Sequence, residues 1–251
     1  MSDALKKKLT EQQIAEAKKA VASEACKLIQ AHSIIGLGSG TTMEYLAEEI
    51  GRRNRNGEDI KAVPTSYEMI LLAKEYDIPV LDANSVSRLQ LGIDGADELD
   101  PRGNVIKGGG GAQTTEKIVA SLAEQYVVIV DETKLVETLG KRMPVPVEVL
   151  PSALELVLRR LESFDCKVKI RTGTGKVGPV ITDLGNIILD VHFAQIKDCR
   201  LLDWQLNNIP GVTGHGLFVG MVDKAIIGYI DTGVPKTRIQ NFQKDKNEVK
   251  I

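Results

Sequence analysis

Acidic residues gather in the segment Asp94-Gly95-Ala96-Asp97-Glu98, directly after an apolar run. The small spacers let Asp94 and Asp97 project from one turn into a common cavity. Carboxylates placed close together raise the pKa of one of them, which makes an acid–base pair available near neutral pH. The alternative for this motif alone is an Asp-rich surface turn that caps a helix.

A second segment places a cation beside backbone donors. Lys107 is followed by four glycines, Gly108 to Gly111, whose N–H groups suit negative charge developing on an oxygen. Glu116 follows in the expected first turn of a helix, where the helix dipole favours the ionised carboxylate and therefore a base. A glutamate there usually only stabilises the helix start, so its significance comes from the glycines before it.

The third segment is Gly36-Leu37-Gly38-Ser39-Gly40-Thr41-Thr42, between an expected strand and an expected helix. Its glycines allow close approach of the backbone, and the first N–H groups of the helix can bind an anion together with the hydroxyl groups. The dinucleotide fingerprint needs glycine where Thr41 stands, and a Walker loop needs Gly-Lys-Ser/Thr, so both are excluded. A tight turn without a ligand would look similar.

Together these segments supply an anion site, two close carboxylates, a cation with N–H donors and an ionised carboxylate. Such a set is suited to moving a proton next to a carbonyl group through an enediolate, without a metal or redox cofactor. His32, His192 and His215 are scattered and lack ligand spacing to a cysteine, so no metal site is expected. The sequence also has no Gly-x-Ser-x-Gly nucleophile elbow with triad partners.

Strands alternate with helices along the first 130 residues, which predicts a parallel sheet covered on both faces. Helices are expected from Thr10, whose spacing to Gln13 is that of a capping box, and over 43–50, 66–76 and 115–125. Strands are expected over 33–37, 60–63, 78–81, 89–93, 105–106 and 126–130, and a surface connection over 52–59. The ligand crevice of an open α/β sheet lies at the carboxyl ends of its strands, where the three segments fall.

The pattern changes near Met143-Pro144. The expected order from there is strand 145–149, helix 152–164, strand 167–171, a hairpin with its turn at 183–186 and second strand at 187–191, helix 201–208 and strand 212–217. This βαββαβ order predicts a small α+β (ferredoxin-like) domain over 144–214, inserted in a Rossmann-like main domain of residues 1–143 and 215–251. Residues 225–230 are expected to return to the first sheet, and a solvated tail to begin at Lys236.

Composition limits the class of protein. A chain of 251 residues with 43% hydrophobic and 26% charged residues is long enough for a main domain and a smaller companion. A net charge of −2 gives no global reason to expect a nucleic-acid or membrane partner. Three cysteines without paired spacing, a polar N-terminal segment and no apolar run of about 20 residues predict a cytoplasmic protein without a membrane span.

The motifs resemble those of the type A ribose-5-phosphate isomerase family. The resemblance rests on residues 38–42, 94–98, 107–110, 116–117, 144–148 and 186–190. It implies interconversion of D-ribose 5-phosphate and D-ribulose 5-phosphate through a cis-enediolate in the pentose phosphate pathway. It also implies a Rossmann-like main domain with a small α+β domain, catalysis without a cofactor, and assembly as a homodimer or homotetramer.

The resemblance further implies roles for single residues. Glu116 corresponds to the base that moves a proton between C1 and C2, and Lys107 to the lysine that stabilises the enediolate oxygen. Asp94 corresponds to the carboxylate that opens the furanose ring, and Asp97 to its partner on the substrate hydroxyl groups. The other implied substrate-binding residues are Lys18, Ser39, Gly40, Thr41, Thr42, Gly95, Ala96, Gly108, Gly109, Gly110 and Lys134.

Two other functions stay open at this point. A non-catalytic sugar-phosphate sensor on the same scaffold explains the anion site but gives no reason for Lys107 and Glu116 together, and no basic helix-turn-helix is found. An amino-sugar-phosphate isomerase or a CoA transferase of related fold fits the architecture. The Asp94–Asp97 and Lys107–Glu116 sets favour the pentose enzyme over both.

Overall fold

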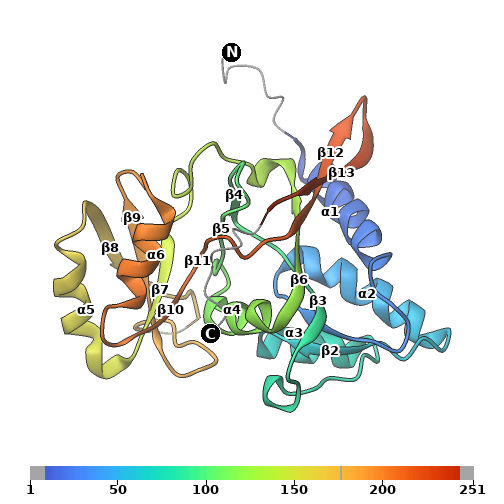
Figure 1. Cartoon of the computed structure of the whole chain (residues 1–251), viewed down its shortest axis with the longest axis horizontal. Coiled ribbons are helices and arrows are strands. Elements are labelled where there is room, and N and C mark those ends of the chain that lie inside the picture. The colour runs from blue at the N-terminus through green and yellow to red at the C-terminus, as the bar shows by residue number, and fades with distance from the viewer. Residues whose placement is uncertain (1–8, 176, 244–251) are drawn as a thin grey trace.

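The structure is a computed structural model that describes residues 9–175 and 177–243. A six-stranded sheet at the right of Figure 1 forms the centre of its larger part. Its strands are β1 (Ile34–Leu37), β2 (Lys61–Pro64), β3 (Leu89–Asp94), β6 (Ala123–Asp131), β12 (Lys224–Asp231) and β13 (Val234–Asn241). The order is β13-β12-β6-β3-β1-β2, with β13 antiparallel to β12 and the others parallel. The predicted parallel sheet is confirmed.

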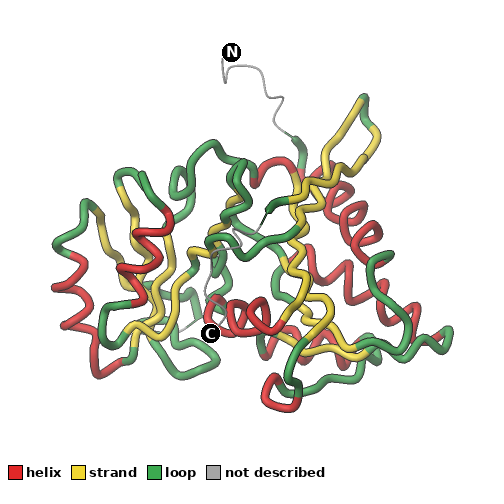
Figure 2. The backbone as a smooth tube through the Cα atoms, viewed as in Figure 1, coloured by secondary structure: helices red, strands yellow, loops and turns green. Residues whose placement is uncertain are grey.

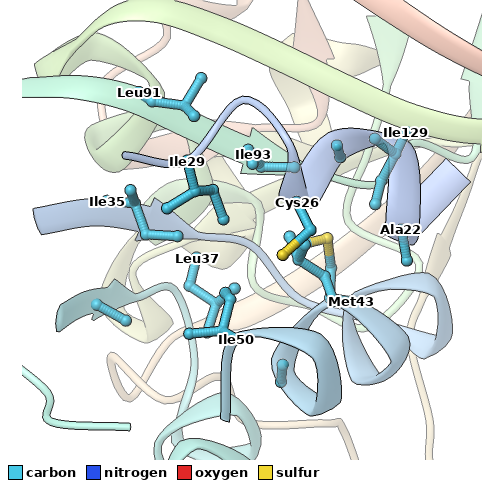
Figure 3. Close-up of a cluster of buried hydrophobic side chains, with 14 of the residues drawn as sticks. Ala22, Cys26, Ile29, Ile35, Leu37, Met43, Ile50, Leu91, Ile93 and Ile129 are labelled. Carbon is cyan, nitrogen blue, oxygen red and sulfur yellow. The ribbon is translucent and has the colours of Figure 1, made fainter. Parts of the chain in front are cut away.

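Helices cover both faces of this sheet. They are α1 (Glu11–Cys26), α2 (Thr41–Arg55), α3 (Tyr67–Glu75) and α4 (Gln113–Leu122). Along β6, Val127 and Ile129 face the core that contains α1 and α2, while Val128 and Val130 face the core that contains α4. This alternation follows from the two-residue period of a strand. Both cores are mainly aliphatic, and Figure 3 shows side chains of the first one.

A second sheet, at the left of Figure 1, is antiparallel throughout, with the order β10-β7-β9-β8. Its elements are β7 (Val145–Val149), α5 (Leu154–Leu161), β8 (Cys166–Ile170), β9 (Ile187–Phe193), α6 (Cys199–Asn207) and β10 (Val212–His215). Figure 2 shows both sheets in yellow with their helices in red. The βαββαβ order is the predicted one, and the predicted fold class, a Rossmann-like sheet with an additional small α+β part, is confirmed. The domain boundaries stay a prediction.

A small sheet of β4 (Glu98–Leu99), β5 (Val105–Ile106) and β11 (Leu217–Phe218) lies between the two larger ones (Figure 1). Lys107 comes directly after β5, and its N–H donates to the carbonyl oxygen of Gly216 at 2.8 Å. A Cβ atom at Gly216 would lie 2.0 Å from the carbonyl oxygen of Lys107, so this close approach requires glycine. The backbone of Lys107 is thereby fixed between the two larger sheets.

Short 3-10 helices complete the structure, and none of the helices within residues 9–175 and 177–243 is long and apolar enough to cross a membrane. The 3-10 helices are η2 (Ala83–Ser85), η3 (Glu132–Lys134) and η4 (Pro151–Ala153). The predicted capping box of Thr10 and Gln13 is present at the start of α1.

Several element predictions were wrong in detail. The strand expected over 78–81 is a single bridge between Val80 and Ala62. Residues 52–55 form the last turn of α2, because the Arg53 guanidinium donates to the carbonyl oxygens of Cys26 and Ile29 and pairs with Glu58. The helix expected to end at residue 125 ends at Leu122 instead. Residues 123–125 pair with β3 and belong to β6.

Two segments near the C-terminus also differ from the prediction. The strand expected over 212–217 is divided between β10 and β11, which lie in different sheets. Residues 236–241 are part of β13 and pair with β12 along its full length. The prediction of a solvated tail is wrong for these residues, because an exposed edge strand carries polar side chains and lacks an apolar alternation. Residues 244–251 lie outside the described residues.

Candidate active site

The candidate site lies at the point where the strand order of the main sheet reverses. β1 and β3 are neighbours, with Leu37 beside Ile93, whereas β2 and β6 lie on their outer sides. The loops after β1 and β3 therefore meet in the crevice where such sheets bind ligands. The N–H of Gly38 donates to the carbonyl oxygen of Ile93 at 2.9 Å, and a Cβ at Gly38 would lie 2.0 Å from the Asp94 carboxyl group. Only glycine allows the two loops to come this close.

A cavity of about 240 Å³ opens at this crevice. It is lined by all but one of the residues that the sequence analysis singled out for the site: Lys18, Ser39, Gly40, Thr41, Thr42, Gly95, Ala96, Asp97, Lys107, Gly108, Gly109, Gly110, Glu116 and Lys134. Asp94 lies beneath this lining, with 1% of its surface exposed. The structure thus brings together residues that are up to 116 positions apart in the chain, from Lys18 to Lys134.

A buried cation holds two carboxyl groups together. The Lys107 Nζ atom lies 2.9 Å from Asp94 Oδ1 and 3.3 Å from Glu116 Oε1, and it donates to the carbonyl oxygen of Gly95 at 2.5 Å. Burial opposes the charge of Lys107, but Asp94 and Glu116 more than offset it, so that the pKa of Lys107 is raised. Lys107 is therefore held as a cation.

The Asp94 carboxylate is fixed from several sides. Its Oδ1 atom accepts from the N–H groups of Gly95 at 2.7 Å and Ser39 at 3.2 Å, and its Oδ2 atom accepts from the Tyr126 hydroxyl at 3.1 Å. Burial raises the pKa of Asp94 although Lys107 opposes the shift. Repulsion between Asp94 and Asp97 is the cause that the sequence alone suggests. Burial, which only the tertiary structure reveals, is the larger effect.

Glu116 lies on α4 and is 4% exposed. Burial raises its carboxyl pKa to about 8, against the attraction of Lys107. The expected stabilisation of the ionised form by the helix dipole is thus outweighed, and the predicted direction of the shift was wrong. The Oε2 atom has no hydrogen-bond partner in the part of the chain that the structure describes. A base with a pKa near neutrality and one unbonded oxygen at a cavity is suited to proton transfer.

The glycine loop, residues 108–111, forms the wall next to Lys107. Its Gly109 N–H donates to Asp97 Oδ2 at 2.8 Å, which ties this loop to the loop after β3. Gly108 has a φ of +96°, and a Cβ atom there would lie 2.6 Å from Gln113 Oε1. Glycine at 108 is therefore required by conformation and by space. From the outer side, Arg171 donates to the carbonyl oxygens of Gly108 and Gly109.

The N-terminus of α2 also lines the cavity, and Gly40 is there the N-cap residue, with a φ of +104° and no side chain to cap the helix. Lys18 Nζ donates to Thr41 Oγ1 at 2.6 Å, and Lys134 of η3 also lines the cavity. A helix N-terminus with a lysine beside it is suited to binding an anion. The Ser39 hydroxyl, in contrast, is bonded to the hydroxyl groups of Thr65 and Ser66.

Sequence reasoning missed several residues at this site. Ser66 lines the cavity and caps α3, and its position after β2 at the carboxyl edge of the sheet was a usable signal. Thr182 and Asp183 line the cavity from the loop before β9, and Asp183 Oδ2 accepts from the Tyr67 N–H at 2.8 Å. Tyr126 and Arg171 had no local signal.

Within residues 9–175 and 177–243, no group of three or more His, Cys, Asp or Glu side chains has an arrangement that could hold a metal ion.

Comparison with known proteins agrees with this geometry. A family model described as ribose 5-phosphate isomerase A (phosphoriboisomerase A) matches residues 61–232. The chain is 46% identical over 232 residues to ribose-5-phosphate isomerase A of Thermosynechococcus vestitus, covering 92% of this chain and 98% of the relative. It is 45% identical over 217 residues to the protein of the same name from Thermococcus kodakarensis, covering 86% and 95%.

Solved structures agree as well. A D-ribose-5-phosphate isomerase in complex with phospho-erythronic acid superposes with a TM-score of 0.86 at 43% identity, covering 90% of this chain and 99% of that one. Ribose 5-phosphate isomerase A of Methanocaldococcus jannaschii gives a TM-score of 0.83 at 43% identity, covering 89% and 98%. The chain therefore belongs to the ribose 5-phosphate isomerase A family.

Proposed function

We propose that this protein interconverts D-ribose 5-phosphate and D-ribulose 5-phosphate through a cis-enediolate, as an aldose–ketose isomerase of the pentose phosphate pathway. The observation that carries the proposal is the position of Glu116. It lines the same cavity as Lys107 and the first residues of α2, it pairs with Lys107, and its buried Oε2 has no hydrogen-bond partner among the described residues. A phosphorylated sugar bound in this cavity would have its phosphate group at the N-terminus of α2 and its carbonyl end beside Glu116.

The phosphate group would bind at the N-terminus of α2. The N–H groups of the first turn, the hydroxyl groups of Thr41 and Thr42, and the cations Lys18 and Lys134 supply donors and positive charge there. This end of the substrate takes no part in the chemistry, so its binding energy serves to hold C1 and C2 in place.

Ring opening requires a group that moves a proton between the ring oxygen and the hydroxyl group on C1. Asp94 and Asp97 are the pair that we propose for this step. Asp97 lines the cavity and can contact the sugar directly, whereas Asp94 is buried against Lys107 and would act through it. Asp97 is therefore the group that we expect to touch the hydroxyl groups.

Isomerisation follows at Glu116. Ionised Glu116 takes the proton from C2 of the aldose, the electron pair forms the C1=C2 bond of the enediolate, and the proton returns to C1, while the O2 proton ends on O1. Lys107 and Gly110 line the cavity, and we propose that the Lys107 ammonium group and the Gly110 N–H stabilise the negative charge that develops on oxygen, while the Gly109 N–H holds Asp97. Fixed donors at that place lower the barrier because they need no reorientation during the reaction.

We further propose that the protein acts without a cofactor or nucleic-acid partner, as a homodimer or homotetramer in the cytoplasm. A net charge of −2 supports the lack of a nucleic-acid partner. Exposed apolar side chains support assembly, since Tyr67 and Leu71 on α3 and Leu201 and Trp204 on α6 are each more than half exposed. Sedimentation velocity measures the assembly state, and a monomer at micromolar concentration would contradict it.

The test of the activity is direct. The protein is incubated with D-ribose 5-phosphate in buffer with a chelator, and NMR follows the appearance of D-ribulose 5-phosphate. We expect conversion to the equilibrium mixture from either sugar and no turnover of glucosamine 6-phosphate. Binding of ribose 5-phosphate without ketose formation would instead support a sensor, and turnover of the amino sugar would support the related deaminase.

A further inference from the structure

One arginine of the four-stranded sheet reaches the glycine loop. Arg171 follows β8, and its backbone N–H donates to the carbonyl oxygen of Ile188 on β9 at 2.9 Å. Its Nε atom lies 3.2 and 3.1 Å from the two carboxylate oxygens of Asp190, also on β9, and Nη2 pairs with the same group. Both side chains are mostly buried, at 15% and 16% exposure. A guanidinium group held in this way by a carboxylate has its plane fixed before any substrate binds.

The remaining nitrogen of this guanidinium group, Nη1, donates to two backbone carbonyl groups. Nη1 lies 2.7 Å from the carbonyl oxygen of Gly108 and 3.2 Å from that of Gly109. A trans peptide directs its N–H away from its C=O, so the N–H groups of Gly109 and Gly110 must point away from Arg171. The Gly109 N–H indeed donates to Asp97 on the cavity side, and Gly110 lines the cavity. No protein acceptor bonds the Gly110 N–H among the residues that the structure describes.

The loop needs such an external contact. Glycine backbones populate positive and negative φ almost equally, so four successive glycines have little preference of their own for one orientation. Gly108 and Gly111 both have positive φ, at +96° and +85°. The arrangement that directs the Gly109 N–H to Asp97 and turns the Gly110 N–H away from Arg171 is thus selected by contacts from outside the loop.

We propose that Arg171, anchored by Asp190, is a positioning residue that orients two peptide groups of the glycine loop, so that the Gly109 N–H holds Asp97 and the Gly110 N–H is directed toward the reacting oxygen of the sugar. The four-stranded sheet then takes part in catalysis without touching the substrate. The inference rests on the proposed isomerase function and adds the element that sets the direction of its N–H donors.

The test compares Arg171→Met and Arg171→Lys with a matched control, Arg159→Met. Arg159 lies on α5 of the same part of the chain and forms an exposed ion pair with Glu155. For Arg171→Met we expect kcat to fall on the order of 10- to 100-fold, less than the cost of deleting an oxyanion donor outright. KM should change by less than about threefold, because the phosphate end is bound elsewhere. Arg171→Lys should resemble Arg171→Met in kcat, since an ammonium group cannot bridge Asp190 and two carbonyl groups.

Two binding probes separate positioning from a merely structural role. The dissociation constant of phospho-erythronic acid, whose carboxylate is planar like the enediolate, should rise by the same factor as kcat/KM falls. That of inorganic phosphate should stay unchanged. Asp190→Asn should lower kcat in the same direction, and the double variant with Arg171→Met should be no worse than Arg171→Met alone.

Turnover of both Arg171 variants within twofold of Arg159→Met would overturn the inference, as would an equal loss of inorganic phosphate binding. Should Arg171→Met fail to fold, Arg171→Lys and Asp190→Asn decide the question by the same measurements. Absence of isomerisation in the unaltered protein and in Arg159→Met would count against the proposed function instead.

Discussion

Replacing Glu116 by glutamine should remove turnover and at the same time stabilise the fold at neutral and alkaline pH. Burial raises the pKa of Glu116 to about 8, whereas a glutamate in an unfolded chain titrates near 4.3. Between these values the folded protein keeps a proton that the unfolded chain has released. The unfolded state binds fewer protons, so the free energy of unfolding falls as pH rises through this window.

The magnitude follows from the pKa difference. One such group lowers the free energy of unfolding by up to about 1.4 kcal/mol per pH unit, which amounts to at most about 4 kcal/mol between pH 5 and pH 8. Glutamine has nearly the same shape and does not titrate, and its amide oxygen can still accept from Lys107. Glu116→Gln should therefore match the unaltered protein at pH 5 and exceed it in stability by roughly 2–4 kcal/mol at pH 8.

The assay is equilibrium urea unfolding at pH 5, 6, 7 and 8, at one protein concentration because assembly contributes to apparent stability. Glu155→Gln, on the exposed surface of α5, is the control and should show no such trend. A Glu116→Gln protein that is less stable at pH 8, or a stability difference that does not change with pH, would refute the reasoning.

Three further substitutions test the buried groups. Gly38→Ala places a Cβ atom 2.0 Å from the Asp94 carboxyl group, so the free energy of unfolding in urea should fall by about 3 kcal/mol or more. Gly110→Ala, whose Cβ atom would meet open space, should be as stable as the unaltered protein. Lys107→Met leaves the buried Asp94 carboxylate without its cation, which raises the pKa of Asp94 further and should cost about 3–5 kcal/mol of stability at pH 8. The loss should be smaller at pH 5, and equal losses at both pH values would contradict this. Tyr126→Phe removes the hydrogen bond to Asp94 Oδ2, which raises the pKa of Asp94 further. The free energy of unfolding should fall by about 1–3 kcal/mol at pH 8. Unchanged stability at this pH would show that the hydroxyl group does not hold the carboxylate.

The elements and residues that the sequence predicts well are those with a local signal. Glycine spacing and clustered acids at the ends of apolar runs indicate loops at the carboxyl edge of a parallel sheet. The structure places the segments after β1, β3 and β5 around one cavity. The βαββαβ order of the second sheet could be predicted because each element has its own periodicity and turn residues.

What the sequence could not predict depends on contacts between distant segments. Arg171 meets Gly108 from 63 positions away, and nothing near Arg171 in the chain indicates that contact. The raised pKa of Glu116 comes from burial, whereas the sequence shows only its place at a helix start, from which the opposite shift was expected. β13 escaped prediction because its exposed side chains have no apolar alternation, although its backbone pairs fully with β12.

The central claim is that Glu116 carries the proton between C1 and C2. The most direct measurement is NMR of ribose 5-phosphate in deuterium oxide, which follows isomerisation and deuterium uptake at C2 of ribose and C1 of ribulose together. We predict that Glu116→Gln lowers both rates by the same factor, on the order of 10² to 10⁴, while phospho-erythronic acid still binds. If Glu116→Gln took up deuterium or isomerised the sugar at nearly the rate of the unaltered protein, the account would be contradicted.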